Sequence, residues 1–279
     1  MKKKPVISLV IPIYGVEKYI GKFAESVLGQ SYPDIQFVFV NDGTKDSSIG
    51  ILTTLIEEKF SHLKEQIIII NKQNEGLPAA RRTGMEHVTG DYVWHIDSDD
   101  WISEEAVAKI AEEIIRTDAD IVYFDFAKEY ADRTAIKRER EYCGETKSQY
   151  IKNIFSHKSY GCTWNKCFRV ALFRNNVIYT PRYAYGEDPY LTLQLISFAK
   201  SISHVPEVLY HYRKDNPHSI TKTSKRSQHK AFVLNFLDLY EKIRCCSVND
   251  NPLAVLCRPI LRRARWYNFI HHLGLTIRK

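Results

Sequence analysis

The sequence of 279 residues contains no long apolar run. Its longest aliphatic run is Ile67–Ile70, whereas crossing a bilayer takes roughly 18–20 apolar residues. The opening stretch MKKKPVISLVIP has the basic and apolar parts of a short signal peptide. However, Pro5 and Pro12 bracket the apolar part, and no small-residue cleavage site follows. We therefore predict that this stretch is a first strand and that the protein is cytoplasmic.

The sequence also has no CxxC pair among its six cysteines. Without a signal peptide, a disulfide framework is not expected. We therefore predict reduced thiols with structural roles.

The net charge of the chain is +7, but most of the chain carries no net positive charge. Residues 225–279 hold eleven Lys and Arg against three Asp and Glu, so the other residues sum to about −1. The basic excess belongs to the C-terminal segment and accompanies no nucleic-acid-binding motif, which argues against a nucleic-acid partner.

The first 127 residues alternate between apolar runs and helical patterns. Strands buried on both faces are continuous apolar runs, and helices repeat apolar residues every three to four positions. By these criteria strands are predicted at Val6–Ile13, Ile35–Val40, Gln66–Ile70, Tyr92–Ile96 and Asp120–Phe126, and helices at Glu17–Leu28, Asp46–Phe60, Leu77–Val88 and Ser103–Arg116. This order is typical of an α/β fold with a mostly parallel central sheet and helices on both faces.

The second half has a weaker pattern. Residues 129–147 are polar and are predicted to form a loop. Helices are predicted at Ser148–Phe155 and Asp188–Phe198, and a pair of short strands at Ile202–Pro206 and Val208–Tyr212.

Polar residues follow four of the predicted strands. They are Tyr14, Asn41–Gly43, Asn71–Gly76 and Asp97–Asp100. In an open α/β sheet, ligands bind beyond the carboxyl ends of the strands, so these residues are expected to line one binding edge. A purely structural role does not predict acids and glycines there.

The strongest local signal is Asp97-Ser98-Asp99-Asp100, which has three carboxylates within four residues. Crowded carboxylates raise one another's pKa unless a cation neutralises them. Hard divalent cations bind one or two carboxylates and complete their shell with phosphate oxygens. The cluster fits a metal site or a solvated loop, and Asp100 fits a helix cap equally well.

Other candidates keep two interpretations each. Arg81 suits a phosphate or a buried carboxylate, and Gly76 is either an approach point for a ligand or a simple turn. Glu187 and Asp188 are either helix caps or, beside a diphosphate, a general base.

Trp164 fits packing or stacking against a sugar, and Lys166 fits a surface lysine or a phosphate contact. His211 fits a packed residue or a metal ligand.

Together these motifs resemble the family 2 glycosyltransferases of the GT-A fold, especially bacterial polysaccharide enzymes. The resemblance covers about residues 5–222. Its parts, in order, are Val10–Tyr14, Val40–Asp46, Asn74–Gly84, Gly90–Val93, Asp97–Asp100, Gly186–Asp188, and Tyr210–Arg213 with Ser219–Thr221. In this order the set is highly specific.

The resemblance implies a binding site for a nucleotide-sugar donor, with UDP as the usual nucleotide. Pro12 and Tyr14 would line the base pocket, and Asp42 would hydrogen-bond the base. The remaining members of this set would be Asn74, Gly76, Arg81, Asp97 and Ser98.

The resemblance also implies inverting transfer to a hydroxyl of a saccharide or lipid-linked acceptor. Asp99 would bind Mn²⁺ or Mg²⁺, with His211 as a second candidate ligand, and Asp188 would be the base, with Glu187 beside it. Residues on the acceptor or diphosphate side would be Trp164, Lys166, Tyr212, Arg213 and Ser219.

The expected organisation is a catalytic GT-A domain over residues 1–222 and a basic helical extension over 223–279. Within the domain, 1–127 would bind the nucleotide and 128–222 would face the acceptor. The extension fits an amphipathic helix on an anionic inner membrane face or a helix that packs on the domain.

Two alternatives on the same fold stay open. A sugar-phosphate nucleotidyltransferase would need a glycine-rich basic loop after the first strand, where this chain has Tyr14-Gly15-Val16-Glu17. A non-catalytic sugar-binding relative would not need the carboxylates that are present.

Overall fold

The computed structural model describes residues 3–138, 146–155, 158–181 and 185–217, and seven residues of a later helical stretch (232, 234, 235, 238, 239, 241 and 242). The chain forms two compact units. The first contains residues 1–143, 162–177 and 199–217, and the second contains 144–161, 178–198 and 218–279. Ser219 and most of the predicted basic extension lie outside the described residues.

The described part of the first unit is built on one mixed sheet of nine strands in the order β3-β2-β1-β4-β8-β6-β9-β5, with β7 also paired to β6. The strands are β1 (Ile7–Ile13), β2 (Ile35–Asn41), β3 (Ile67–Asn71), β4 (Tyr92–His95), β5 (Trp101–Ile102), β6 (Ile121–Glu129), β7 (Thr134–Lys137), β8 (Lys166–Arg169) and β9 (Ile202–Arg213).

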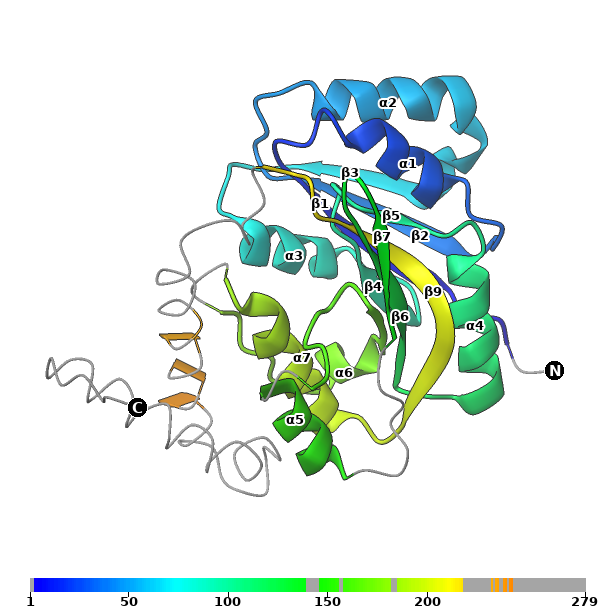
Figure 1. The fold of residues 1–279 in the computed structure, drawn as a ribbon. Helices are drawn as coiled ribbons and strands as arrows, with labels where there is room; N and C mark the ends of the chain where they lie inside the picture. The colour runs from blue at the N-terminus through cyan, green and yellow to red at the C-terminus, as the bar shows by residue number, and fades with distance from the viewer. Residues whose placement is uncertain are drawn as a thin grey trace, which may run out of the picture. The chain divides into compact units, whose positions relative to one another are not determined.

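The N-terminal half of the sheet is parallel, as the alternating sequence pattern predicts. β1 pairs in parallel with both β2 and β4, and β2 pairs with β3. Strand order runs one way from β1 to β3 and then reverses to β4. Right-handed crossovers therefore put the first two helices on one face and the third on the other, as Figure 1 shows for α1 (Ile20–Leu28) and α2 (Ser48–Lys59) above the strands and α3 (Leu77–Glu86) below.

Close packing fixes α3 to the sheet. All seven residues of β1 are buried. A Cβ at Gly84 of α3 would lie 2.5 Å from Val10 Cγ1 and 3.3 Å from Val40 Cγ2. Glycine allows this approach, which packs the C-terminal half of α3 against the middle of β1 and the end of β2.

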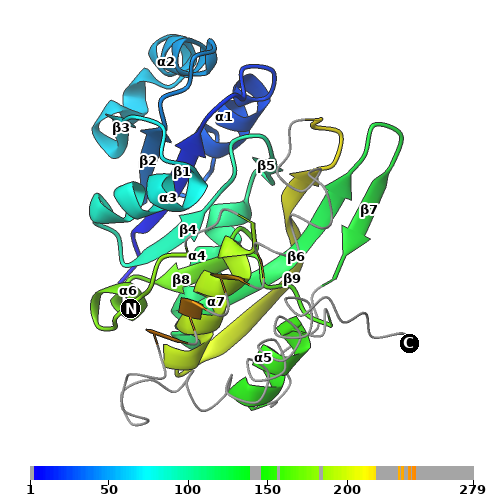
Figure 2. The same cartoon turned by 90° about the vertical axis from the view of Figure 1, so that its left-hand side faces the viewer.

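The C-terminal half departs from the simple alternation. β8 runs antiparallel between β4 and β6, and α4 (Ala106–Thr117) packs against β6 and β9. Residues predicted as a loop contain β7, which forms an antiparallel hairpin with β6 that extends beyond the neighbouring strands in Figure 2.

The predicted strand pair after residue 201 is wrong. Residues 202–213 form the single strand β9, parallel to β6. Pro206, which lacks an N–H, lies where the pairing register shifts between Phe124 and Phe126, so the irregularity is a bulge and not a chain reversal.

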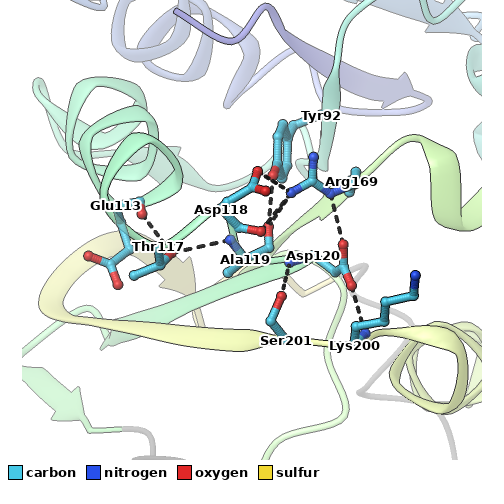
Figure 3. A network of polar contacts seen from close by, with 9 residues as sticks. All are labelled: Tyr92, Glu113, Thr117, Asp118, Ala119, Asp120, Arg169, Lys200 and Ser201. Carbon is cyan, nitrogen blue, oxygen red and sulfur yellow. Dashed lines mark hydrogen bonds and ion pairs between the residues drawn. The ribbon is translucent and has the colours of Figure 1, made fainter. Parts of the chain in front are cut away.

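A polar network ties the far ends of the strands together (Figure 3). The Arg169 guanidinium binds Asp120 Oδ1 at 2.8 Å and Asp118 Oδ1 at 2.7 Å, and it lies over the ring of Tyr92. Asp120 also accepts from the backbone N–H of Lys200. These contacts join β4, α4, β6, β8 and β9 at the end of the sheet opposite the predicted binding edge.

The second unit includes α5 (Lys147–Phe155) and α7 (Glu187–Phe198). Gly161 lets the chain pass close to both, since a Cβ there would lie 2.9 Å from Ile154 and 2.8 Å from Pro189. Gln194 hydrogen-bonds the backbone of Tyr179 through both ends of its amide. None of the helices in the described ranges is long and apolar enough to cross a membrane.

Candidate active site

The carboxyl ends of β1 and β4 meet where the strand order reverses. Such a switch point is the place where open α/β sheets bind ligands. Ser98, directly after β4, donates from Oγ to the carbonyl of Pro12 at 2.7 Å, and both residues are buried. Tyr14 follows β1 and is 54% exposed, so an aromatic face is available at this point.

Asp42 organises the loop that follows β3. Its side chain is buried and accepts from the backbone N–H of Glu75 at 3.1 Å, from that of Gly76 at 2.8 Å and from Lys72 Nζ at 2.9 Å. These three donors lie within the protein, so the Asp42 carboxylate has hydrogen-bonding partners without a ligand. Asp42 therefore has a structural role in this loop, and its hydrogen bond to a base stays a prediction.

Two glycines allow this loop to form. Gly43 has φ of +67°, and a Cβ there would lie 2.8 Å from the backbone nitrogen of Asn74. Gly76 begins α3 with φ of +87° and has open space around it. Asn74, whose backbone nitrogen lies near Gly43, is exposed. The predicted positions Asn74 and Gly76 thus lie on an accessible loop beside the switch point.

Arg81 is buried in α3 and forms an ion pair with Asp97, with Nη2 2.6 Å from Oδ1. The Asp97 side chain is 25% exposed. Of the two partners that the sequence allows for Arg81, the structure shows the carboxylate. The ion pair orients the Asp97 carboxylate and leaves part of that side chain open to a ligand.

Asp99 lies in a loop that the end of β9 encloses. Arg213 Nε donates to the Asp99 carbonyl at 2.7 Å, and Asn216 Nδ2 donates to Asp99 Oδ2 at 2.8 Å. The Asp99 residue remains partly exposed. Segments more than 100 residues apart in sequence therefore fix the position of this carboxylate.

Asp100 is completely buried and is not open to a metal. Its two oxygens accept from the Tyr210 hydroxyl at 2.6 Å and from the Arg213 backbone N–H at 2.7 Å. Burial, together with the nearby Asp99 and Asp97, raises the pKa of Asp100 well above its usual range. Asp100 therefore has a structural role, which was one of the predicted alternatives. Its contacts hold the end of β9, however, and do not cap a helix.

His211 has hydrogen-bonding partners at both ring nitrogens. Nδ1 is 2.8 Å from Glu129 Oε1, Nε2 is 3.2 Å from Ser103 Oγ, and the ring stacks on Trp101 at 5.2 Å. Metal binding by His211 would require one of these contacts to open, and it stays a prediction. Arg213 and Lys22 lie over the same Trp101 ring, at 5.0 and 3.3 Å from its centre.

Trp164 is a packing residue. It is 5% exposed, stacks on Tyr210 at 4.7 Å and lies at 5.2 Å from Tyr212. Its carbonyl accepts from the indole N–H of Trp94. With Tyr210 on one face, little of the ring is available to a sugar, and the packing interpretation applies.

Lys166 is not the surface lysine that one interpretation predicted. It is completely buried, and its Nζ donates to the Cys162 carbonyl at 3.0 Å and to Asn165 Oδ1 at 2.7 Å. A charge in such a place needs these oxygens, which also makes the alternative phosphate contact inaccessible.

Glu187 and Asp188 belong to the second unit, where they form the first turn of α7. Glu187 is buried and Asp188 is partly exposed. Acids at a helix N-terminus interact favourably with the helix dipole, so both positions have a structural reason as well as the predicted catalytic one.

The sequence interpretation missed Asn216 and Trp101. Asn216 was hidden in the polar stretch after β9, and only its contact with Asp99 reveals it. Trp101 directly follows the acidic cluster, so its position gave a signal, but its ring contacts come from two distant segments, α1 and β9.

Residues 8–179 match the family model described as glycosyl transferase family 2. The chain belongs to family 2 of the glycosyltransferases. It is also similar to the Bacillus subtilis (strain 168) protein named "Putative glycosyltransferase EpsH", with 31% identity over 258 residues, 89% of this chain and 71% of the relative. It shares 30% identity with glycosyltransferase GlyA of Streptococcus pneumoniae, covering 74% of this chain but 30% of that protein.

Solved structures confirm the GT-A fold of this family 2 glycosyltransferase. The S. aureus TarS fragment 1–349 with UDP-GlcNAc has a TM-score of 0.69 at 17% identity, and the match covers 98% of this chain and 93% of that one. The mannosyltransferase PcManGT from Pyrobaculum calidifontis, with GDP-Man and Mn²⁺, has a TM-score of 0.60 at 16% identity, with coverage of 95% and 70%.

Proposed function

We propose that this glycosyltransferase transfers a sugar, with inversion, from a UDP-sugar to a hydroxyl of a saccharide or lipid-linked acceptor in cell-surface polysaccharide synthesis. Support for the donor comes from the TarS structures with UDP and UDP-GlcNAc, and from GDP-Man in the mannosyltransferase. Support for the pathway class comes from similarity to the Bacillus subtilis minor teichoic acid biosynthesis protein GgaB, at 26% identity.

One observation carries the proposal: the exposed Tyr14, the Arg81-oriented Asp97 and the enclosed Asp99 all lie at the switch point between β1 and β4. A nucleotide placed there would have an aromatic face beside its base. Its ribose or sugar would lie near Asp97, and its diphosphate would lie near Asp99.

A divalent cation fits the residues at Asp99. No group of three or more His, Cys, Asp or Glu side chains among the described residues could by itself enclose a metal ion. Mg²⁺ and similar cations in phosphate-transfer sites bind one or two carboxylates and take their other ligands from water and the substrate phosphates. Asp99 is the proposed ligand, and the bound cation would offset charge on the leaving diphosphate.

The proposed chemistry is a single displacement. Asp188 removes the proton from the acceptor hydroxyl as its oxygen bonds to the anomeric carbon. The bond from that carbon to the diphosphate oxygen breaks, and the nucleoside diphosphate leaves with the electron pair. Attack from the face opposite the leaving group inverts the configuration.

A nucleotide-release assay tests the function. Purified protein is incubated with a panel of UDP-, GDP- and dTDP-sugars, with Mn²⁺ or with EDTA, and released nucleoside diphosphate is measured with and without saccharide acceptors. We expect release from a UDP-sugar that EDTA abolishes and acceptor increases. Absence of release from every donor would contradict the proposal.

The Asp188→Asn variant tests the base. Loss of a general base costs about 10²–10⁴-fold in turnover, and donor affinity should stay within about twofold. Asp34→Asn, at the opposite end of β2 from Asp42, is the matched control and should keep normal turnover. Near-normal transfer by Asp188→Asn would rule out Asp188 as the base.

A further inference from the structure

Three lysines gather on one face of the sheet, on the β6–β7–β9 side. They are Lys128 on β6, Lys137 on β7 and Lys214 directly after β9, here called the lysine cluster. Side chains alternate along a strand, so Lys128 shares a face with Phe126, and Phe126 pairs with Lys137. Tyr212 pairs with Lys128 in β9 and therefore lies on the same face.

The three positive charges are close enough to repel one another. Partial burial, then Lys137 and Lys214, lower the pKa of Lys128. None of the ion pairs among the described residues involves Lys137 or Lys214. Other charged side chains close to the sheet, such as Arg81 and Arg169, have carboxylate partners. A bound anion would relieve the repulsion in the lysine cluster.

Aromatic side chains lie beneath these charges. Lys214 Nζ lies 4.6 Å from the centre of the Tyr212 ring and 3.4 Å from its hydroxyl oxygen. Tyr212 in turn contacts Trp164. The lysine cluster is therefore built on a packed support, which reduces the ordering cost of binding.

The lysine cluster is continuous with the Asp99 loop. Lys214 directly follows Arg213, whose side chain donates to the Asp99 carbonyl. Asn216, two residues after Lys214, donates to the Asp99 carboxylate. On the other side the lysine cluster extends over β6 and β7, away from the β1–β2 strands that hold the nucleotide residues. With the base and ribose at the β1–β4 switch point, as proposed above, the lysine cluster lies on the other side of the Asp99 loop.

We propose that the lysine cluster binds phosphate groups of an anionic acceptor and holds that acceptor beside the donor sugar. This inference rests on the proposed function, because it assigns the acceptor class of the same site. Lysine binds phosphate as a point charge. Neighbouring strands are about 4.8 Å apart, so charges on β7, β6 and β9 span roughly 10 Å, which suits a chain with more than one phosphate.

Binding of a defined polyanion tests the proposal. The probe is a fluorescently labelled oligomer of glycerol phosphate, measured by fluorescence polarisation in EDTA at low salt. Its uncharged match is a polyglycerol of equal length. We expect the wild-type protein to bind the oligomer and not the polyglycerol, with affinity that falls as salt rises.

Lys128→Gln, Lys137→Gln, Lys214→Gln and the triple variant locate the binding. At about 1 kcal/mol per ionic contact, each single change should weaken binding about 3- to 10-fold and the triple change by more than about 30-fold. Lys59→Gln, on α2 and paired with Glu25, removes the same charge elsewhere and should have no effect. UDP affinity in Mn²⁺ should remain within about twofold in all variants, which shows that they are folded.

Equal oligomer binding by the wild type and the triple variant would overturn the proposal, as would an equal loss in Lys59→Gln. Equally tight binding of an oligogalacturonate would overturn the choice of phosphate over carboxylate. These outcomes leave the proposed function intact if wild-type donor release continues; failure of that release is a separate result.

The same phosphate chemistry could be offered by a soluble chain or at a lipid surface. Vesicles of phosphatidylcholine with phosphatidylglycerol, compared with phosphatidylcholine alone, separate these sources. Vesicle binding that is lost in the triple variant supports a lipid-borne phosphate, and oligomer binding alone supports a soluble chain. Binding of either kind that the triple variant retains counts against the lysine cluster.

Discussion

Two parts of the first unit differ in how their charged side chains are paired: the β1–β2–β4 side, proposed to bind the nucleotide, and the β6–β7–β9 side, proposed to bind the acceptor. Around β1, β2 and β4, the acids are held by internal donors: Asp42 by two backbone N–H groups and Lys72, and Asp97 by Arg81. On the β6–β7–β9 face, Lys137 and Lys214 lie beside Lys128 without an ion-paired carboxylate among the described residues. A site whose charges are already paired is preorganised. A face of like charges, in contrast, is stabilised most by a ligand of opposite charge.

Asp99 lies at the boundary between the two sides and is expected to show the largest effect. Asp99→Asn should reduce turnover about 10²- to 10³-fold and weaken its dependence on Mn²⁺, because cation binding supplies several kcal/mol of charge stabilisation. Turnover against Mn²⁺ concentration measures this.

Asp215→Asn is the matched control for Asp99→Asn. Asp215 lies directly after β9, in the segment that contacts Asp99, with its side chain 43% exposed and 3.5 Å from Arg213. Its turnover should stay within about twofold of wild type, since no ligand role is assigned to it. An equal loss in both variants would show that any acid near the end of β9 matters and that Asp99 has no special role.

The preorganised side around β1, β2 and β4 should be sensitive to backbone changes. Gly43→Ala adds a Cβ 2.8 Å from a backbone nitrogen at φ of +67°, and it should destabilise the fold by about 3 kcal/mol. Gly15→Ala has the same φ but no atom within 4 Å, so it should cost only about 1 kcal/mol. Urea unfolding compares the two, and equal losses would mean that the loop after β3 can move aside.

The smallest effect concerns pH. The pKa of Asp100 is raised in the folded state by burial and by Asp99 and Asp97, so the folded state holds the proton more tightly than the unfolded one. Its stabilising share is present below the unfolded pKa of about 3.9 and is lost as pH rises through the folded pKa. Asp100→Asn keeps an acceptor for Arg213 N–H and should remove this loss.

Urea unfolding of wild type and Asp100→Asn from about pH 4 to neutral checks this expectation. The free energy of unfolding should fall with pH more steeply in the wild type. Asp100→Leu leaves the Tyr210 hydroxyl and the Arg213 N–H without an acceptor and should lose about 1–3 kcal/mol at every pH. Parallel profiles for wild type and Asp100→Asn would show that Asp100 is ionised throughout.

Periodicity predicted the N-terminal elements well because they are long and apolar on both faces. The predicted strand Val6–Ile13 is β1 at Ile7–Ile13, and the predicted helix Leu77–Val88 is α3 at Leu77–Glu86. The sequence pattern did not predict the short strands, because the two residues of β5 and the four of β8 are too few to show a periodicity. β5 is held by its pairing with β9, and β8 by its pairing with both β4 and β6.

Within the site, residue type and order predicted the family but not each side chain's environment. Trp164 and Lys166 are adjacent to a turn in sequence and looked accessible, yet both are buried. Trp164 packs against Phe126 of β6 and Tyr210 of β9, and Lys166 donates to Cys162 and Asn165. The three acids of one tetrapeptide likewise separate into different roles: Asp97 pairs with Arg81, Asp99 faces Asn216, and Asp100 binds Tyr210.

The sequence by itself determined the family, the α/β alternation and the presence of acids after β4, because these follow from local patterning and from motifs in a specific order. The tertiary structure decided which of those acids stays accessible and which lysines lie together. Those properties depend on side chains up to about a hundred residues away, which only the packing of β9 against β5 and β6 brings into contact.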